Sequence, residues 1–331
     1  ALCMVPGDNM PPARQHAKGI VPLNGNAKLI SANDSSGFTY RGRFTEDSQA
    51  VTVSYEASQK AHNALRWLIV NQGETYGGRT FLCWNPQGKA VRSPQSSFLR
   101  AGGKTHHIAS DYQDALNSEL LGLKAKLPDN ADIVLAAFDA ATTGRLALTY
   151  YSELPAADFL QRLRDWDAVC CWNNGPYGIQ SPPLPQIVDF AFGSPRTSNG
   201  KTHFETDDRL LKQHLQRLIA CRVHGSRIPV DYPRALSAKA SDLQLINDSG
   251  LREKLLFTAC AVIRKYHYDR NGEVYTMSLE PEKKDISYLP FLKKQNGTHM
   301  TKKKSVSRMQ CVCKVSLFSA RCTHSVFFAN R

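Results

Sequence analysis

The chain has 331 residues, of which 42% are hydrophobic and 21% charged, and its formal net charge is +13. That is enough apolar material for one large domain or two ordinary ones, and the positive surplus favours a polyanionic partner, either nucleic acid or an anionic membrane. The longest apolar run, Ile133 to Phe138, is about six residues. Because a bilayer requires ~20, no segment is predicted to span a membrane.

The cysteine pattern indicates the cellular compartment, and the first residues indicate whether the chain is a fragment. There are nine cysteines, an odd number that includes the adjacent Cys170 and Cys171. This pattern is typical of a reducing cytosol rather than of a disulfide framework, so we expect a cytoplasmic protein. The chain begins with Ala, and no signal-like segment precedes Cys3, so we treat the chain as a possible fragment.

The first 50 residues predict irregular and extended structure. Residues 1–27 are rich in Pro, Gly and Asn and lead into a short predicted strand over 28–32. After a cluster of turn formers, residues 38–44 alternate between aromatic or small and polar side chains. This period of two predicts an extended segment with Arg41 and Arg43 on one face.

Residues 54–70 are predicted to form an amphipathic helix. The polar face of this helix carries Lys60 and Arg66 and also Trp67, an aromatic residue that we expect to find a partner, by default another part of the same fold. The positions predicted to face inward are Ala57, Ala61, Ala64, Leu65, Leu68 and Ile69.

The remainder of the first half mixes strands and helices. A strand is predicted over 80–84, a long polar loop over 85–109, a helix over 112–126, and a β-hairpin from 133–138 and 145–151. A helix over 154–171 completes this part. Its inward residues are predicted to be Phe159, Leu160, Leu163 and Trp166.

The second half is predicted to be mainly helical. A Pro-rich stretch over 175–185 indicates a boundary. Four helices are predicted beyond it, over 185–192, 207–221, 231–240 and 251–266. The second of these is predicted to turn Leu210, Leu211, Leu215, Leu218 and Ile219 inward, and its basic outer face is either solvated or in contact with phosphates.

The last 42 residues differ in composition from the rest. They hold nine Lys or Arg and no acid, which predicts a disordered basic tail. Residues 1–289 carry 33 basic and 29 acidic side chains, so most of the net charge lies in the tail. Together the patterns predict an α+β fold with a mixed region over 1–174, a helical region over 175–289 and the tail over 290–331.

The motif search yields no catalytic centre and no metal site. Gly73–Thr80 approaches the spacing of a phosphate-binding loop, but Arg79 stands where such a loop needs Lys, a helix precedes it and a strand follows. We therefore interpret it as a turn. Cysteine and histidine in Cys311-x-Cys313 and Cys322-x-His324 are spaced too tightly for an ordinary zinc site. We accordingly predict no cofactor and no metal, and no residue is assigned a catalytic role.

Basic and aromatic side chains are the remaining candidates for a site. Arginine and lysine bind phosphates by charge, and exposed aromatic rings stack on bases that have left a duplex. The same types of side chain also occur on an ordinary solvated surface, which is the alternative interpretation. The candidate nucleic-acid-binding residues are Arg41, Arg43, Lys60, Arg66 and Trp67.

Several sequence blocks resemble a known family, the large subunit of the type I-C CRISPR surveillance complex, Cascade (the Dvulg-subtype Csd family). The blocks span residues 1–289, and their combination is more specific than any one of them. They include Cys3-Met-Val-Pro-Gly7, Lys28-Leu-Ile-Ser-Ala-Asn33, Val53-Ser-Tyr55, Phe138-Asp139-Ala-Ala-Thr-Thr-Gly144-Arg145-Leu146 and Ala259-Cys260-Ala261 through Arg264-Lys265-Tyr266.

The resemblance implies a non-catalytic subunit of an RNA-guided antiviral complex. In such a complex, base pairing reads the sequence, while protein reads a short adjacent motif and holds the displaced strand of the R-loop. The implied partners are guide RNA, target DNA, other Cascade subunits and a recruited helicase-nuclease. The family's N-terminal region lies before Ala1, and the tail after Leu289 departs from the family pattern. The alternative is an enzyme acting on nucleic acid or nucleotides through the degenerate phosphate loop.

Overall fold

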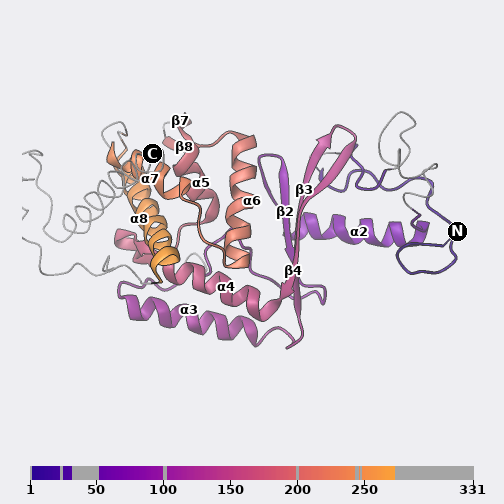
Figure 1. Ribbon diagram of the computed structural model, residues 1–331, viewed down its shortest axis with the longest axis horizontal. Helices are drawn as coiled ribbons and strands as arrows, with labels where there is room; N and C mark the ends of the chain where they lie inside the picture. Colours follow the sequence, from indigo (N-terminus) through magenta and orange to yellow (C-terminus); the bar gives the residue numbers. More distant parts are fainter. Residues whose placement is uncertain are drawn as a thin grey trace, which may run out of the picture. The chain divides into compact units, whose positions relative to one another are not determined.

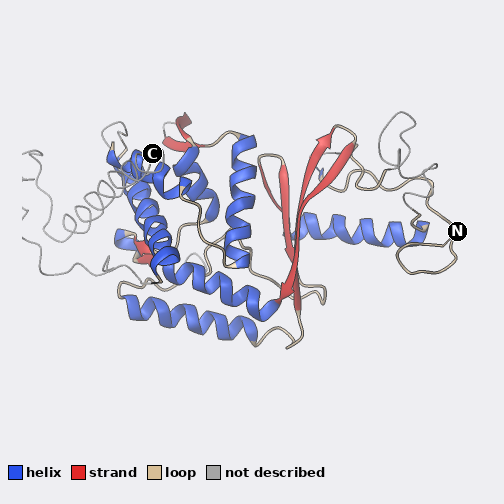
Figure 2. Cartoon of the chain, in the orientation of Figure 1, coloured by secondary structure: helices blue, strands red, loops and turns tan. Residues whose placement is uncertain are grey.

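The computed structural model describes residues 2–22, 25–31, 52–99, 103–198, 201–242, 246 and 248–272. The fold is α+β, as predicted, with helices and antiparallel sheets (Figures 1 and 2). The chain divides into two compact units. Unit 1 comprises residues 1–91 and 130–155, and unit 2 comprises 92–129 and 156–331. The division predicted at 174/175 and 289/290 stays a prediction about domain organisation.

Unit 1 contains a four-stranded antiparallel sheet in the order β1-β2-β3-β4. Gly77 and Gly78 have positive φ angles of 54° and 77° and form the tight turn between the first two strands. The predicted β3–β4 hairpin is confirmed and is longer than expected, with an irregular register between Ala137 and Phe138. The strands are β1 (Glu74–Tyr76), β2 (Arg79–Trp84), β3 (Asp132–Thr142) and β4 (Arg145–Pro155).

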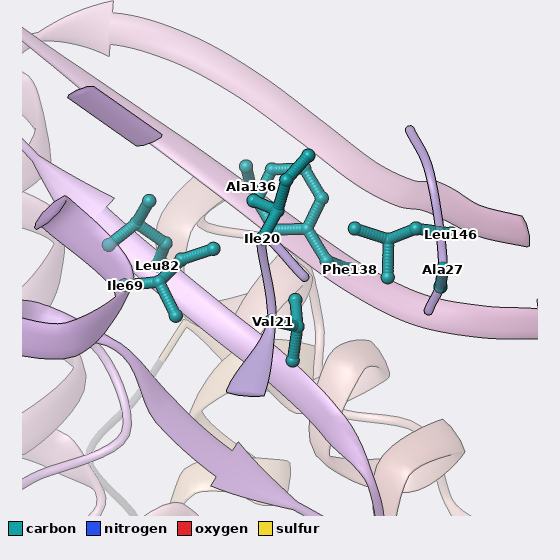
Figure 3. Packing of buried hydrophobic residues seen from close by; sticks show 8 residues of the cluster. All are labelled: Ile20, Val21, Ala27, Ile69, Leu82, Ala136, Phe138 and Leu146. Carbon is teal, nitrogen blue, oxygen red and sulfur yellow. The ribbon is translucent and has the colours of Figure 1, made fainter. Parts of the chain in front are cut away.

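One helix, α2 (Tyr55–Gln72), packs against this sheet and confirms the helix predicted over 54–70. Ser54 caps its start by accepting a hydrogen bond from the backbone N–H of Ala57, which satisfies one of the donors left free at a helix start. Ile69 of α2 joins a buried cluster with the sheet and the N-terminal segment (Figure 3). The cluster consists of Ile20, Val21, Ala27, Ile69, Leu82, Ala136, Phe138 and Leu146.

The inward face of α2 was predicted only in part. Ile69 is buried and Leu65 is half-buried, but Ala61 and Ala64 are exposed, so their predicted burial is wrong. The buried positions also include Ser58 and His62. Nδ1 of His62 is hydrogen-bonded to the carbonyl oxygen of Ser58 and lies 3.2 Å from its hydroxyl oxygen, which makes burial less costly although a pattern of apolar residues cannot reveal it.

Residues 2–22 and 25–31 form what we call the N-terminal strap, which follows α2 from its first residue toward its end. Tyr55 at the start of α2 donates its backbone N–H to the carbonyl of Pro11 (3.0 Å), and Ala13 donates to the carbonyl of Val53 (2.9 Å). The strand predicted over 28–32 is wrong in its described part, because Lys28 makes only isolated bridges to Lys18 and Arg145. The strap is therefore held by contacts with neighbours rather than by a ladder of its own.

Unit 2 is mainly helical, and its helices confirm those predicted, with shifted ends. At the centre lies α8, in which every residue from Leu255 to Tyr266 is buried and which contacts α4, α5 and α7. The inward residues predicted for the helix over 154–171 are all buried, whereas Leu210, predicted inward, is 42% exposed. The helices are α3 (Ala109–Lys124), α4 (Ala156–Val169), α5 (Leu184–Phe192), α6 (Asp208–His224), α7 (Asp231–Ser241) and α8 (Ser249–Asn271).

Two short strand pairs and a 3₁₀ turn in unit 2 were not predicted. They are too short or too polar to show a period of two, the signal by which a half-buried strand is recognised. The second pair forms a hairpin in which every residue of the first strand is exposed. These elements are β5 (Trp172–Asn173), η2 (Gly175–Tyr177), β6 (Ile179–Gln180), β7 (Ser194–Ser198) and β8 (Lys201–Glu205).

A buried ion pair fixes the polar loop before α3. The Arg222 guanidinium lies 2.6 Å from a carboxylate oxygen of Asp167, and both side chains are at most 1% exposed. Arg222 also donates to the carbonyls of Pro94 and Ser96, and Asp167 accepts from the backbone N–H of Phe98. Because charges are costly to bury unless paired and hydrogen-bonded, this network ties the loop firmly to α4 and α6.

Candidate nucleic-acid interface

Only three of the five predicted site residues fall in the described part of the chain. Arg41 and Arg43 lie outside it, as does the whole extended segment predicted over 38–44. Their assignment to phosphate binding therefore stays a prediction. Lys60, Arg66 and Trp67 all lie on α2 in unit 1.

Lys60 and Trp67 share the outer face of α2, the face turned away from the buried Ser58, His62 and Ile69. They are seven residues apart, which places them almost above one another on an α-helix. Trp67 is 61% exposed, so within unit 1 its ring is largely uncovered and the expected intramolecular partner is not found among the described residues. An uncovered indole on the same helix face as a cation is a surface on which an unpaired base can stack.

The ammonium of Lys60 has an acidic neighbour. Its Nζ atom lies 2.5 Å from Oε1 of Glu56, one helical turn earlier, and both side chains are more than half exposed. The hydrogen bond from Lys60 and the charge of its ammonium lower the pKa of Glu56 below its usual value. Such exposed pairs are weak and screened by salt, so Lys60 remains available to a phosphate that displaces the carboxylate.

Arg66 is directed toward the strap instead of the outer face. Its Nη2 donates to the carbonyl of Lys18 (3.0 Å) and its Nε donates to the carbonyl of Gly19 (3.3 Å). The structure thus places Lys60 and Trp67 on one face and gives Arg66 contacts with backbone 47 and 48 residues earlier. Sequence spacing alone could not separate these two uses of a basic side chain.

The Gly73–Thr80 segment contains β1, the turn at Gly77 and Gly78 and the start of β2, so its interpretation as a turn holds for these two glycines only. The turn leads into a strand, whereas a phosphate loop leads into a helix whose N-terminal amides face the phosphate. Arg79 is engaged in an ion pair with Asp139 across the sheet, at 3.0 Å. The segment therefore lacks the geometry of a nucleotide-binding loop.

The histidine and cysteine side chains of the chain were also considered as possible ligands or site residues. His214 of α6, which is half-buried, stacks on Phe192 with ring centroids 3.9 Å apart, and its Nδ1 lies 3.1 Å from the hydroxyl of Tyr232, so its ring is packed among aromatic neighbours. Cys311, Cys313, Cys322 and His324 lie outside the described residues. Within the described ranges, no three side chains of His, Cys, Asp or Glu meet in a way that could hold a metal ion.

No helix in the described part of the chain has the length and apolar character needed to cross a bilayer.

A feature that the sequence search missed is the group formed by His16, Ser58 and His62, in which His16 comes from the strap and the other two residues from α2. The signal available was the i, i+4 spacing of Ser58 and His62. The third member lies 42 residues earlier in the chain and is joined to them by folding.

Comparison with known proteins finds a family for most of the chain. Residues 1–290 match the sequence model of the family described as CRISPR-associated protein (Cas_Csd1). The match takes in every residue that the structure describes, in both units. Among individually curated proteins, none matches the chain.

Proposed function

The chain belongs to the Cas_Csd1 family of CRISPR-associated proteins, and we propose that it acts as the large subunit of a type I-C Cascade complex. In this role it binds target DNA and stabilises the displaced strand without catalysing a reaction, in the cytoplasm. Its partners are guide RNA, the other Cascade subunits and the helicase-nuclease that the complex recruits. Base pairing with the guide reads the target, and protein reads only a short adjacent motif, so most of the protein's contacts have to hold nucleic acid of any sequence.

The observation that supports this proposal most strongly is the extent of the family match. It runs from residue 1 to residue 290 and therefore includes the sheet of unit 1 and all six helices described in unit 2. A match confined to one motif would be compatible with a borrowed domain. A match of this length favours a protein that does the work of the family.

Within this role, the outer face of α2 is our candidate contact for unpaired DNA. Trp67 offers a flat, exposed ring, and Lys60 lies on the same face, where it can meet a phosphate. Stacking on an aromatic ring tolerates any base, because every base has a π-face. This property suits a surface that must hold a displaced strand of arbitrary sequence.

Substitution of Trp67 tests this contact. In the assembled complex, we expect Trp67→Ala to weaken binding of a single-stranded DNA by about 1–3 kcal/mol, while Trp67→Phe retains much of the affinity. Fluorescence anisotropy with a labelled oligonucleotide measures both. Tyr177→Ala is the matched control, because Tyr177 is an exposed aromatic of unit 2 (63% exposed) outside the proposed contact. Equal effects of the two alanine variants, or none, would contradict the contact.

Assembly tests the function as a whole. Co-expression of the chain with a guide RNA and the remaining Cascade subunits should yield a complex that co-purifies through a tag on another subunit. Failure of the chain to enter the complex would refute the proposed role irrespective of the outcome for Trp67.

A further inference from the structure

A loop in unit 2, residues 225–228, is fixed beside the end of α8. The backbone N–H of Ile228 donates to Oδ2 of Asp269 in α8, at 2.9 Å. The thiol of Cys221, in the last turn of α6, donates to the carbonyl oxygen of Arg227, at 3.6 Å. These two contacts join the backbone of the loop to the ends of both helices.

This arrangement gathers two arginines from distant parts of the chain. Arg227 precedes Ile228, and Arg270 follows Asp269, so a hydrogen bond links the residues directly beside the two arginines. Both arginine side chains are exposed. Within the described part of the chain, neither guanidinium has a hydrogen-bond or ion-pair partner. The fold therefore leaves two unpaired cations at this place on the surface of unit 2.

The carboxylates in the same neighbourhood are already paired with other cations. Asp269 lies 2.5 Å from the ammonium of Lys265, and both side chains are 9% exposed. Asp231, the first residue of α7, is paired with Arg217 at 2.8 Å. These four are also the charged groups, among the described residues, whose fields act on the thiol of Cys221 beside the loop. The two pairs cancel in charge, so the positive charge of the exposed arginines is not compensated locally.

The guanidinium of Arg270 is also held against an aromatic ring. Its Cζ atom lies 4.6 Å from the ring centroid of Tyr266, one helical turn earlier. Such a contact restricts the side chain and does not use its N–H donors, which point to an acceptor outside the described residues. Tyr268, between them in the sequence, is 37% exposed. Arg270 therefore presents its donors from a restricted position.

Helix electrostatics alone offers a simpler explanation for one of these arginines. The C-terminal end of a helix carries a partial negative charge, and a cation in its last turn stabilises it. This explains Arg270 in the last turn of α8. Arg227 lies beyond the C-cap of α6, Gly225, where the effect of the helix dipole has fallen off. Stabilisation of a helix end would alter unfolding, whereas a phosphate contact would alter the salt dependence of binding.

We propose that Arg227 and Arg270 form a phosphate-binding pair that contacts the sugar-phosphate backbone of a nucleic-acid strand. A guanidinium suits phosphate oxygens because its planar donors can bind two of them at once. Both side chains are exposed, so the surface suits a polymer of phosphates rather than a small enclosed anion. The inference rests on the proposed function only in that the chain holds nucleic acid, and it does not require the contact at Trp67.

The salt dependence of binding tests the pair. The double variant Arg227→Gln with Arg270→Gln is compared with the wild type by fluorescence anisotropy, using the full chain alone and labelled single-stranded DNA, duplex DNA and single-stranded RNA of equal length. Loss of two phosphate contacts should make the log–log salt dependence shallower by about 1.4 for a single strand or about 1.8 for a duplex. The strand type that shows this change is the one that the pair holds. An unchanged slope with all three would overturn the proposal, whether or not the chain assembles into Cascade.

A matched control removes the same charge elsewhere in unit 2. Arg196→Gln with Lys254→Gln changes two exposed cations, one on β7 and one near the start of α8, at the opposite end of that helix from Arg270. This variant should keep the wild-type slope. An equal change in the two double variants would show a general effect of net charge and would refute the assignment to Arg227 and Arg270.

A measurement on the unaltered protein covers the case in which the double variant does not fold. Phenylglyoxal modifies exposed arginine side chains, and mass spectrometry of the full chain reports the rate at each one. A saturating amount of the oligonucleotide that binds most tightly should slow modification of Arg227 and Arg270 several-fold. Arg196, exposed on β7, serves as the internal reference and should react as before. Equal rates at Arg227 and Arg270 with and without the oligonucleotide would overturn the proposal by themselves.

Discussion

In each unit an arginine side chain fixes a segment of backbone. In unit 2 the buried Arg222 binds the loop before α3, and in unit 1 Arg66, which lies nearer the surface, binds the strap. Arg222 donates to the carbonyls of Pro94 and Ser96, and Arg66 donates to those of Lys18 and Gly19. The chemistry is the same, a guanidinium that bridges two carbonyls of one backbone segment. Arg222 is also paired with the buried Asp167, since a cation withdrawn from water needs an anion. Burial should therefore decide how much each contact contributes to stability.

The largest expected effect is the loss of Asp167. In Asp167→Ala the Arg222 cation is left buried without its partner, and the backbone N–H of Phe98 loses its acceptor. We expect a loss of about 3–5 kcal/mol in the free energy of unfolding, measured by urea denaturation. A double variant, Asp167→Leu with Arg222→Met, removes both charges and should recover part of the loss. A loss under about 1 kcal/mol for Asp167→Ala would show that burial does not make the Arg222 contact more stabilising than the more exposed contact of Arg66.

The second effect tests how tightly the backbone of unit 2 is packed. Gly178 has φ +69°, and a Cβ built there would lie 2.3 Å from the carbonyl oxygen of His106. Gly178→Ala thus combines an unfavourable conformation with a clash against backbone, and we expect it to cost about 1–3 kcal/mol. Gly175→Ala is the matched control, with φ +62° and open space around the added methyl. If both variants lost the same amount, backbone strain alone would account for it and the close approach would contribute nothing.

These interior contacts also mark the limit of what sequence predicts. The face of α4 was predicted correctly because Phe159, Leu160, Leu163 and Trp166 repeat at helical spacing and need only an apolar neighbour. The burial of Ser58 and His62 was missed because it depends on His16, which folding alone brings to α2. A pattern of apolar residues records how much surface is buried and says little about which polar groups are paired.

The candidate site shows the same limit in a single pair of neighbours. Arg66 and Trp67 are adjacent in the chain, and both were predicted to bind nucleic acid. Because successive helical residues point about 100° apart, one meets the strap and the other faces outward. The position of Trp67 on the polar face was predicted, but its ring was expected to be covered by another part of the fold and is instead 61% exposed. The contact of Arg66 with Lys18 and Gly19 could not be predicted, since it requires the path of the strap.

The third prediction concerns this contact in unit 1. Arg66→Ala removes hydrogen bonds to the carbonyls of Lys18 and Gly19, both of which water can reach once the side chain is gone. We expect a loss of about 1 kcal/mol in the free energy of unfolding, well below that of Asp167→Ala. Arg66→Lys should restore part of it. The salt dependence of DNA binding should not change, and a shallower dependence would instead identify Arg66 as a phosphate contact.

The smallest effect separates stability from binding on the outer face of α2. Lys60 and Glu56 form an exposed pair, so Lys60→Gln and Glu56→Gln should leave the urea midpoint unchanged. If Lys60 meets a phosphate, Lys60→Gln should make the log–log salt dependence of single-stranded DNA binding shallower by about 0.7, the counterion released per contact. Glu56→Gln should act in the opposite direction, tightening binding at low salt because the competing carboxylate is gone. Unchanged slopes in both variants would leave Lys60 as a solvated residue, with Trp67 as the remaining candidate on that face.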